Sequence, residues 1–265
     1  MIYGPTYMAK SRQTTLLVDA DIVAYQHAAS GQKTFHWDEG VTSIETPPIE
    51  ETVAEARKTL SALAKKFHGT VYLVFSCPVG RNFRKDILPS YKSNRKGEKP
   101  VQYVELRAEL SKHYKVYEKE TLEGDDVMGM LATHPKLIAG RKIIVSIDKD
   151  MQQIPGELYN PGKDTLVKIT KNQGNRYHML QTLTGDATDG YKGCLGCGPI
   201  KAAKALANLY KPFERWEAVL QEYTDKGLTL EDALVQARVA KILQSEDYNF
   251  QTKEPILWQP PSSTA

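Results

Sequence analysis

Two short apolar runs that lead into aspartates constrain the fold of this chain more than any other feature. The runs Thr14 to Asp19 (TTLLVD) and Lys142 to Ile147 (KIIVSI), the second followed by Asp148, have the length and β-branched content of buried strands. Segments with helical spacing separate the strand-like runs. Strands that alternate with helices predict an α/β fold with a mostly parallel central sheet, whose ligands bind at the carboxyl ends of the strands. The sequence therefore predicts acids at the ligand-binding edge of the sheet.

The same patterns predict further elements along the chain. Residues 49–67 have helical periodicity, and Val53, Ala56, Leu60 and Leu63 form one apolar face that is a candidate part of the core. Residues 34–48 show no clear pattern and stay unassigned. The other expected elements are helices over 21–29, 101–113 and 123–133, strands over 71–75 and 115–117, a strand pair over 158–159 and 166–169, a helical region from 177 that is interrupted at 185–198, and a Pro- and Ser-rich end over 255–265.

Composition excludes several classes of protein. The 265 residues are 41% hydrophobic and 25% charged, which is typical of a globular chain with one large domain or a core with a smaller appendage. No stretch approaches the ~20 apolar residues of a membrane span, and residues 1–13 lack the apolar core of a signal peptide, so we expect neither a membrane partner nor export. Three cysteines cannot form a disulfide framework, which favours the reducing cytoplasm.

Acidic residues gather at the predicted strand ends, helix starts and turns. Any single cluster could be a helix cap or a turn, because acids favour both positions. All of them at one sheet edge would repel one another unless cations neutralised them, and hard oxygen ligands select Mg²⁺ or Mn²⁺. Two such ions ~3.5–4 Å apart can activate water and stabilise the leaving oxygen of a phosphodiester. The clusters are Asp19 and Asp21; Glu123, Asp125 and Asp126; Asp148 and Asp150; and Asp186 and Asp189.

Basic residues are concentrated in one segment. Between Arg81 and Lys99 the chain has seven basic and two acidic residues, a local charge of +5, whereas the net charge of the whole chain is +3. A basic segment on a nearly neutral body is typical of a protein that binds a polyanion at one place, although a solvated loop would look similar. Together with the acids, this segment points to a nuclease.

The glycine-rich stretch from Gly185 to Leu206 (GDATDGYKGCLGCGPIKAAKAL) is the most specific string in the chain. Gly193, Gly196 and Gly198 predict a tight turn with exposed backbone N–H groups, and the next residue is a proline suited to the first position of a helix. Lys201 and Lys204 then share one helix face, so the hairpin could hold a nucleic-acid backbone without reading bases. The formal CxxC within it lacks a second ligand pair, and we expect its cysteines to pack in the hairpin.

These strings together resemble the 5′-nuclease family, which comprises flap endonucleases, phage 5′–3′ exonucleases and the 5′-nuclease domain of bacterial DNA polymerase I. The resemblance extends from Leu16 to Leu206 through LLVDAD, FRKDILPSYKSNRK, LEGDDVMGMLA, SIDKDMQQIP and the glycine-rich string, in the family's order. It implies a PIN-like core with a helical arch and a helix–three-turn–helix (helix–hairpin–helix) DNA-binding region. We accordingly expect a catalytic core over 14–175 with a basic arch over 77–100, a helical DNA-binding region over 176–250, and a tail over 251–265.

The resemblance also implies roles for individual residues. Asp125 and Asp148 would lie nearest the reacting phosphate, and Lys92 and Arg95 would hold that phosphate as further catalytic residues. Tyr91 would stack on a terminal base, and the glycine hairpin would bind K⁺. The two divalent metals would be surrounded by Asp19, Glu123, Asp125, Asp126, Asp148, Asp150, Asp186 and Asp189, and DNA would contact Arg84, Lys85, Tyr91, Lys92, Arg95, Lys96, Gly193, Gly196, Gly198, Lys201 and Lys204.

Three departures from the family pattern concern the metals and the phosphate contacts. Ser76 stands where the family usually has an aspartate after its second strand, and Asp21 is a candidate to take over that role. Gln26 stands where an arginine is frequent, and Ile200 where a lysine is frequent. The compact length is similar to that of phage-type members, which implies DNA replication in a host cytoplasm and substrates that are duplex DNA with 5′ ends, nicks or flaps, with RNA–DNA hybrids left open.

Two other functions fit parts of the sequence. A DNA-binding relative without catalysis would account for Ser76, although most of the acids remain. A haloacid-dehalogenase-type phosphatase loosely matches VDAD and GDATD, but its second acid pair is usually spaced one residue further apart, and it would not need the glycine hairpin. Cleavage of RNA, as in toxin-type PIN domains, is a substrate variant of the nuclease reading.

Overall fold

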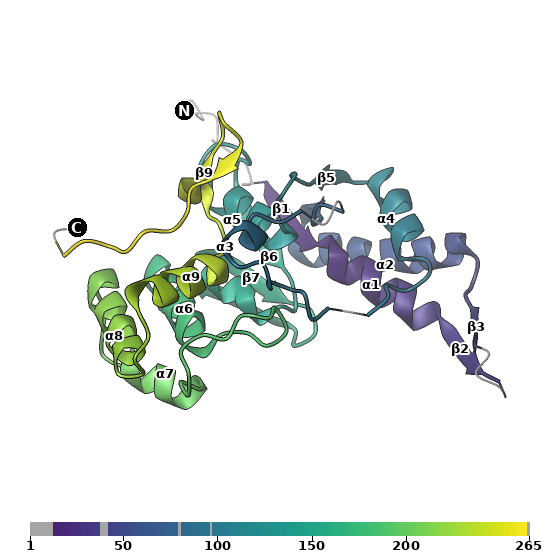
Figure 1. Ribbon diagram of the computed structural model, residues 1–265. Helices are drawn as coiled ribbons and strands as arrows, with labels where there is room; N and C mark the ends of the chain where they lie inside the picture. Colours follow the sequence, from purple (N-terminus) through teal and green to yellow (C-terminus); the bar gives the residue numbers. More distant parts are fainter. Residues whose placement is uncertain (1–12, 38–41, 79–80, 96, 264–265) are drawn as a thin grey trace, which may run out of the picture.

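The chain folds around a six-stranded sheet. The computed structural model describes residues 13–37, 42–78, 81–95 and 97–263. The strand order is β5-β4-β1-β6-β7-β8, and all neighbours are parallel except the last pair, which is antiparallel (Figure 1). The strands are β1 (Thr14–Asp19), β4 (Gly69–Val74), β5 (Lys115–Tyr117), β6 (Arg141–Val145), β7 (Gly156–Asn160) and β8 (Thr165–Ile169).

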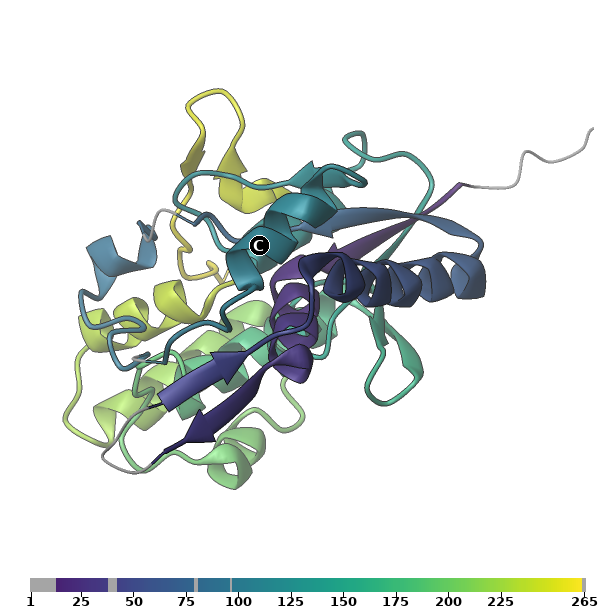
Figure 2. The same cartoon turned by 90° about the vertical axis from the view of Figure 1, so that its right-hand side faces the viewer.

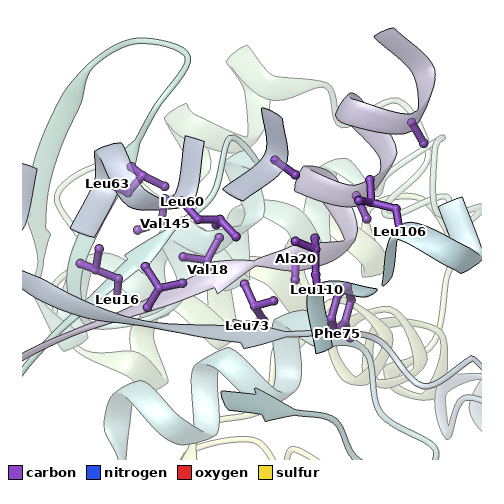
Figure 3. Close-up of a cluster of buried hydrophobic side chains, with 14 of the residues drawn as sticks. Leu16, Val18, Ala20, Leu60, Leu63, Leu73, Phe75, Leu106, Leu110 and Val145 are labelled. Carbon is purple, nitrogen blue, oxygen red and sulfur yellow. The ribbon is translucent and has the colours of Figure 1, made fainter. Parts of the chain in front are cut away.

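Helices cover both faces of the sheet, because alternate residues of its central strands point to opposite sides. Leu16 and Val18 of β1 pack in one core cluster with residues of α1, α2 and α4 (Figure 3), whereas Leu17 packs in a second cluster with α5. This three-layer arrangement confirms the predicted α/β class. The helices of these two layers are α1 (Ala20–Gly31), α2 (Ile49–Phe67), α4 (Tyr103–Ser111) and α5 (Gly124–Thr133).

The carboxyl-terminal part is helical and has a core of its own. A third hydrophobic cluster lies among the helices of this part and includes Leu183, Trp216, Val219 and Ala237. Figure 1 shows these helices on the opposite side of the molecule from α2. Short strands β9 (Tyr248–Asn249) and β10 (Glu254–Pro255) follow. The helices are α6 (Lys171–Thr184), α7 (Pro199–Ala205), α8 (Pro212–Thr224) and α9 (Leu230–Ala240), and two 3₁₀ turns are η2 (Lys149–Gln153) and η3 (Ser245–Asp247).

The unassigned residues 34–48 contain a two-stranded hairpin, β2 (Lys33–His36) and β3 (Thr42–Glu45), which Figure 2 shows as a pair of antiparallel arrows below α2. Within 77–100 the described residues form one helix of four residues, α3 (Arg84–Ile87), and otherwise turns and coil. The expected arch is therefore mostly non-helical, because Pro89, Ser90 and Asn94 favour turns. No helix in the described residues is both long and apolar enough to span a bilayer.

One buried histidine in α6 predicts a pH-dependent stability. His178 donates its Nε2 proton to the carbonyl of Ala237 at 2.8 Å, and burial, with Lys241 nearby, lowers its pKa from 6.5 to about 3. Below pH 6.5 the histidine is therefore protonated in the unfolded chain but stays neutral in the folded protein. His178 thus lowers the free energy of unfolding as the pH falls from about 6.5 towards 3.

A His178→Gln variant, which keeps a side-chain donor, checks this effect. We expect the difference in unfolding free energy between the native protein and the variant to shrink by about 2 kcal/mol from pH 7 to pH 4.5, since only the native histidine titrates. Urea denaturation at the two pH values measures it. A difference that stays constant would contradict the assignment.

Candidate functional site

A cavity of about 940 Å³ opens at the carboxyl ends of the central strands. It brings together acids from β1, α5, η2 and the loop after α6, and basic side chains from the segment 77–100. Every predicted metal ligand except Asp126 lines it. The charged residues of its wall are Asp19, Asp21, Lys92, Arg95, Lys99, Arg107, Glu123, Asp125, Asp148, Lys149, Asp150, Asp186 and Asp189.

The local backbone and a serine position two of these acids, Asp19 and Asp148. Asp19 ends β1 and caps α1 by accepting a hydrogen bond from the N–H of Ile22. Strand β6 ends at Val145, earlier than predicted, and Asp148 caps η2 by accepting from the N–H of Asp150 at 2.8 Å. The hydroxyl of Ser146 donates to Asp19 at 2.8 Å and accepts from the N–H of Asp148 at 3.0 Å. Ser146 was not among the predicted site residues, because the only feature that marks it in the sequence is a polar side chain at the end of an apolar run.

Burial, together with repulsion between neighbouring carboxylates, raises the pKa of several acids in the cavity. Burial raises the pKa of Asp19 to about 7, with Asp21 and Asp148 contributing. Burial and the charges of Asp19 and Asp148 raise the pKa of Asp125 well above its usual value, and burial with Asp148 raises that of Asp150 to about 6. Carboxylates that disfavour one another's ionised form are the arrangement that a bound cation would stabilise.

The hydrogen bonding of Asp150 also tests whether divalent ions fit these residues. The buried Oδ1 atom of Asp150 has no hydrogen-bond partner, which is costly for a carboxylate oxygen and which a cation would relieve. Among the described residues no three His, Cys, Asp or Glu side chains already form a cage around one point. Mg²⁺ needs no such cage, because it keeps several waters and binds through one or two carboxylates. The residues present therefore fit divalent ions that are held partly through water.

The basic segment lies against the acids rather than apart from them. The ammonium of Lys92 pairs with Glu123 and lies 3.5 Å from Asp189, and Arg95 donates to Asp189 at 2.5 Å. Burial would raise the pKa of Glu123, but Lys92 and Arg84 outweigh it and lower that pKa. The cavity thus holds acidic and basic side chains in contact with one another, as a site for a phosphate bridged to cations requires.

Two predicted roles are wrong, because the residues concerned are buried against each other. Arg84 donates twice to Asp126, at 2.7 Å each, and also to the carbonyls of Val239 and Lys241. Asp126 is fully buried and accepts from the N–H of Leu243 as well. Consecutive residues at the start of a helix point in different directions, so Asp125 faces the cavity and Asp126 faces the core. We therefore assign Asp126 no metal and Arg84 no DNA.

Tyr91 is also not available for the role implied by the resemblance. Its side chain is buried, and its hydroxyl donates to Glu123 and Asp189, both at 3.0 Å. A ring in this position cannot stack on a terminal base. Instead it fixes two acids of the cavity wall.

Ser76 and Asp21 do not reconstruct the missing carboxylate. The hydroxyl of Ser76 accepts from the N–H of Gly124, and its own N–H donates to Asp21 at 2.7 Å. The other oxygen of Asp21 accepts from Tyr103 at 2.6 Å, with Arg107 at 3.4 Å. Asp21 is therefore held by protein groups, although it and Gln26 line the cavity.

The glycine-rich stretch forms a turn between α6 and α7. Gly185 and Gly193 both have positive φ, and a Cβ on Gly193 would come within 2.3 Å of the nitrogen of Gly185, so this close approach requires glycine. Cys194 and Cys197 pack in the helical core, as predicted. At the turn, Gly196 and Gly198 are exposed, as are Ile200, Lys204 and, paired with Glu222, Lys201. Lys85 is exposed as well, and Lys96 lies outside the described residues.

Comparisons with known proteins agree with this architecture. Residues 14–179 match the family described as the 5′–3′ exonuclease N-terminal resolvase-like domain. The chain is 28% identical to an exonuclease of Escherichia phage T7, over 92% of this chain and 93% of that protein. It is 29% identical to an exodeoxyribonuclease of Enterobacteria phage T3, over 93% of each.

Solved structures show the same fold. The chain superposes on the T5 D15 protein co-crystallised with metal ions with a TM-score of 0.66 at 13% identity, over 87% of this chain and 90% of that one. A pseudo-enzyme–product complex of a bacteriophage T5 D15 flap endonuclease variant with DNA and metal ions gives a TM-score of 0.63 at 14% identity, over 87% of this chain and 89% of that one.

Proposed function

The chain belongs to the 5′–3′ exonuclease family, and on that premise we propose that it is a divalent-metal-dependent 5′–3′ exonuclease and flap endonuclease that hydrolyses phosphodiester bonds in DNA. The observation that carries the proposal is the cavity itself, where acids from four separate parts of the chain face Lys92 and Arg95. A polyanion with a reacting phosphate is the substrate that such a site suits.

The proposed division of labour follows the geometry of the cavity. Two Mg²⁺ or Mn²⁺ ions, when bound, would activate the attacking water and stabilise the leaving oxygen. Lys92 and Arg95 would orient the scissile phosphate and offset its developing negative charge, since both already face the acids. The acids proposed around one ion are Asp19, Asp125 and Asp148, and those proposed around the other, partly through water, are Asp150, Asp186 and Asp189, with Glu123 beside Lys92.

The remaining parts of the chain complete the proposal. Residues 14–175 would form the catalytic core, 176–250 the DNA-binding region and 251–265 a tail; α6 runs across the first boundary. The hairpin of Gly193, Gly196 and Gly198, with K⁺ bound, would hold the duplex backbone together with Lys201 and Lys204. Lys85 and Lys96 would add to the charge along the DNA path. RNA–DNA hybrids and action in a host cytoplasm belong to the same proposal.

Two lysine variants separate catalysis from binding. Lys92→Ala removes a cation beside the reacting phosphate, and we expect turnover to fall about 100-fold with little change in affinity. Lys201→Ala removes a backbone contact away from the cavity, and we expect affinity to fall several-fold at low salt with turnover almost unchanged. Single-turnover rates and binding titrations measure the two effects. If both variants changed affinity alone, the assigned roles would be wrong.

The direct test is digestion of 5′-labelled duplex, nicked and flapped DNA with Mg²⁺ and with excess EDTA. We expect products shortened from the 5′ end with Mg²⁺ and none with EDTA. Tight DNA binding with no metal-dependent cleavage would favour a binding protein instead. A covalent phosphoryl adduct on Asp19 without any action on DNA would favour a phosphatase.

A further inference from the structure

One cation of the cavity wall, Lys149, lies against Asp150 and Asp186 and has no role in the function proposed above. Lys149 follows Asp148 and precedes Asp150, and its Nζ donates to Asp186 at 2.8 Å and lies 3.8 Å from the unpartnered Oδ1 of Asp150. The hydrogen bond to Asp186 is also the first cause of a raised pKa at Lys149. The ammonium group therefore stands at the place where these two acids would hold a divalent ion.

The acids of the cavity are neutralised unevenly. None of the salt bridges among the described residues reaches Asp19, Asp125 or Asp148. Asp150, Asp186 and Asp189, in contrast, are each within 4 Å of a lysine or arginine nitrogen. An ion can enter the first group without displacing a protein cation, whereas an ion that binds Asp150 and Asp186 must compete with Lys149.

Lys149 is able to move away from these acids because most of its side chain is exposed. The side chain of Lys149 is 63% exposed, whereas that of Lys92 is 17% exposed. The backbone N–H of Lys92 also donates to the carbonyl of Asp189. Lys149 also lines a second groove of about 490 Å³ beside the cavity, over β7 and β8. The other basic residues of that groove are Lys163, Lys168 and Arg176.

We propose that Lys149 is the resident counter-ion of Asp150 and Asp186, that a divalent ion displaces it from them, and that it then turns towards the neighbouring groove. The inference rests on the proposed function, since it concerns the same ions. It makes Lys149 a positioning residue that weakens ion binding on the Asp150–Asp186 side while leaving the other side unaffected. Because displacement moves a positive charge into a basic groove, ion binding on this side increases the positive potential there.

The test is calorimetric titration of the DNA-free protein with Mn²⁺ alone. We expect Lys149→Met to bind the weaker of two Mn²⁺ ions about three- to tenfold more tightly than the native protein, because it removes one positive charge that both competes for the acids and repels the ion. Lys163→Met is the matched control: it carries the same change of charge in the same groove and contacts neither acid, and we expect less than a twofold change.

A double-mutant cycle shows whether Lys149 acts through Asp186. In an Asp186→Asn background the gain from Lys149→Met should largely disappear. Unchanged or weaker Mn²⁺ binding in Lys149→Met, or an equal gain in Lys163→Met, would overturn the inference and leave the proposed function standing. A native protein that binds no Mn²⁺ in this cavity would overturn both.

Discussion

Asp148→Asn is expected to reduce turnover about 1,000-fold, or ~4 kcal/mol in activation free energy, while DNA affinity changes less than threefold. The substitution removes a negative charge from the centre of the acid group. It keeps the oxygen that accepts from the N–H of Asp150, so the η2 turn should survive. The phosphate contacts that we propose for Lys92, Arg95 and the glycine hairpin do not involve Asp148, and binding to DNA should therefore persist.

The matched control for this variant is Asp225→Asn, the same change at an exposed position beyond the end of α8. It should have native turnover. Single-turnover cleavage of a 5′-labelled duplex with Mg²⁺ measures both proteins, and unfolding curves show that both are folded. A loss of only a few-fold in Asp148→Asn would mean that Asp148 lies away from the chemistry.

Asp126→Asn should instead lower the unfolding free energy by about 3–5 kcal/mol, because it removes the carboxylate that accepts two hydrogen bonds from the buried guanidinium of Arg84. The neighbouring variant Asp125→Asn should not destabilise the metal-free protein, since burial and adjacent acids already disfavour the charged form of Asp125. We therefore expect the two adjacent aspartates to have different roles, one in stability and one in activity.

Denaturant unfolding of the metal-free proteins measures this contrast. Asp126→Asn should show an earlier midpoint with an unchanged slope, and Asp125→Asn a midpoint at or above that of the native protein. In cleavage assays at a temperature where both variants are folded, Asp125→Asn should lose more activity than Asp126→Asn. Similar midpoints for the two variants would contradict the distinction between an inward and a cavity-facing acid.

The sequence predicted the elements that a strong local pattern determines. The boundaries of β1, α2 and β5 agree with those expected, because apolar runs and helical periodicity are bounded there by polar or turn-forming residues. The β2–β3 hairpin carried no such signal, since its residues are almost all exposed and do not alternate. The helix content of 77–100 was overestimated by analogy, although its turn-forming residues were visible.

The site was predictable as a set of acids at one edge but not in its internal contacts. The carboxyl ends of parallel strands lie at one edge of the sheet whichever side chains the strands carry. Asp19 and Asp148, which lie at or just after the ends of two such strands, could therefore be expected to lie together. Which of Asp125 and Asp126 faces inward depends on the long-range partner Arg84, which no local pattern reveals. Tyr91 and Lys149 likewise owe their roles to residues far along the chain.

We expect acids that are distant in the sequence to meet around two divalent ions, and anomalous X-ray diffraction from crystals soaked in Mn²⁺ tests this arrangement most directly. We predict a strong peak among Asp19, Asp125 and Asp148, and at higher concentration a second peak beside Asp150 and Asp186. Peaks only elsewhere on the surface, with the cavity free of anomalous signal at saturating Mn²⁺, would contradict this expectation.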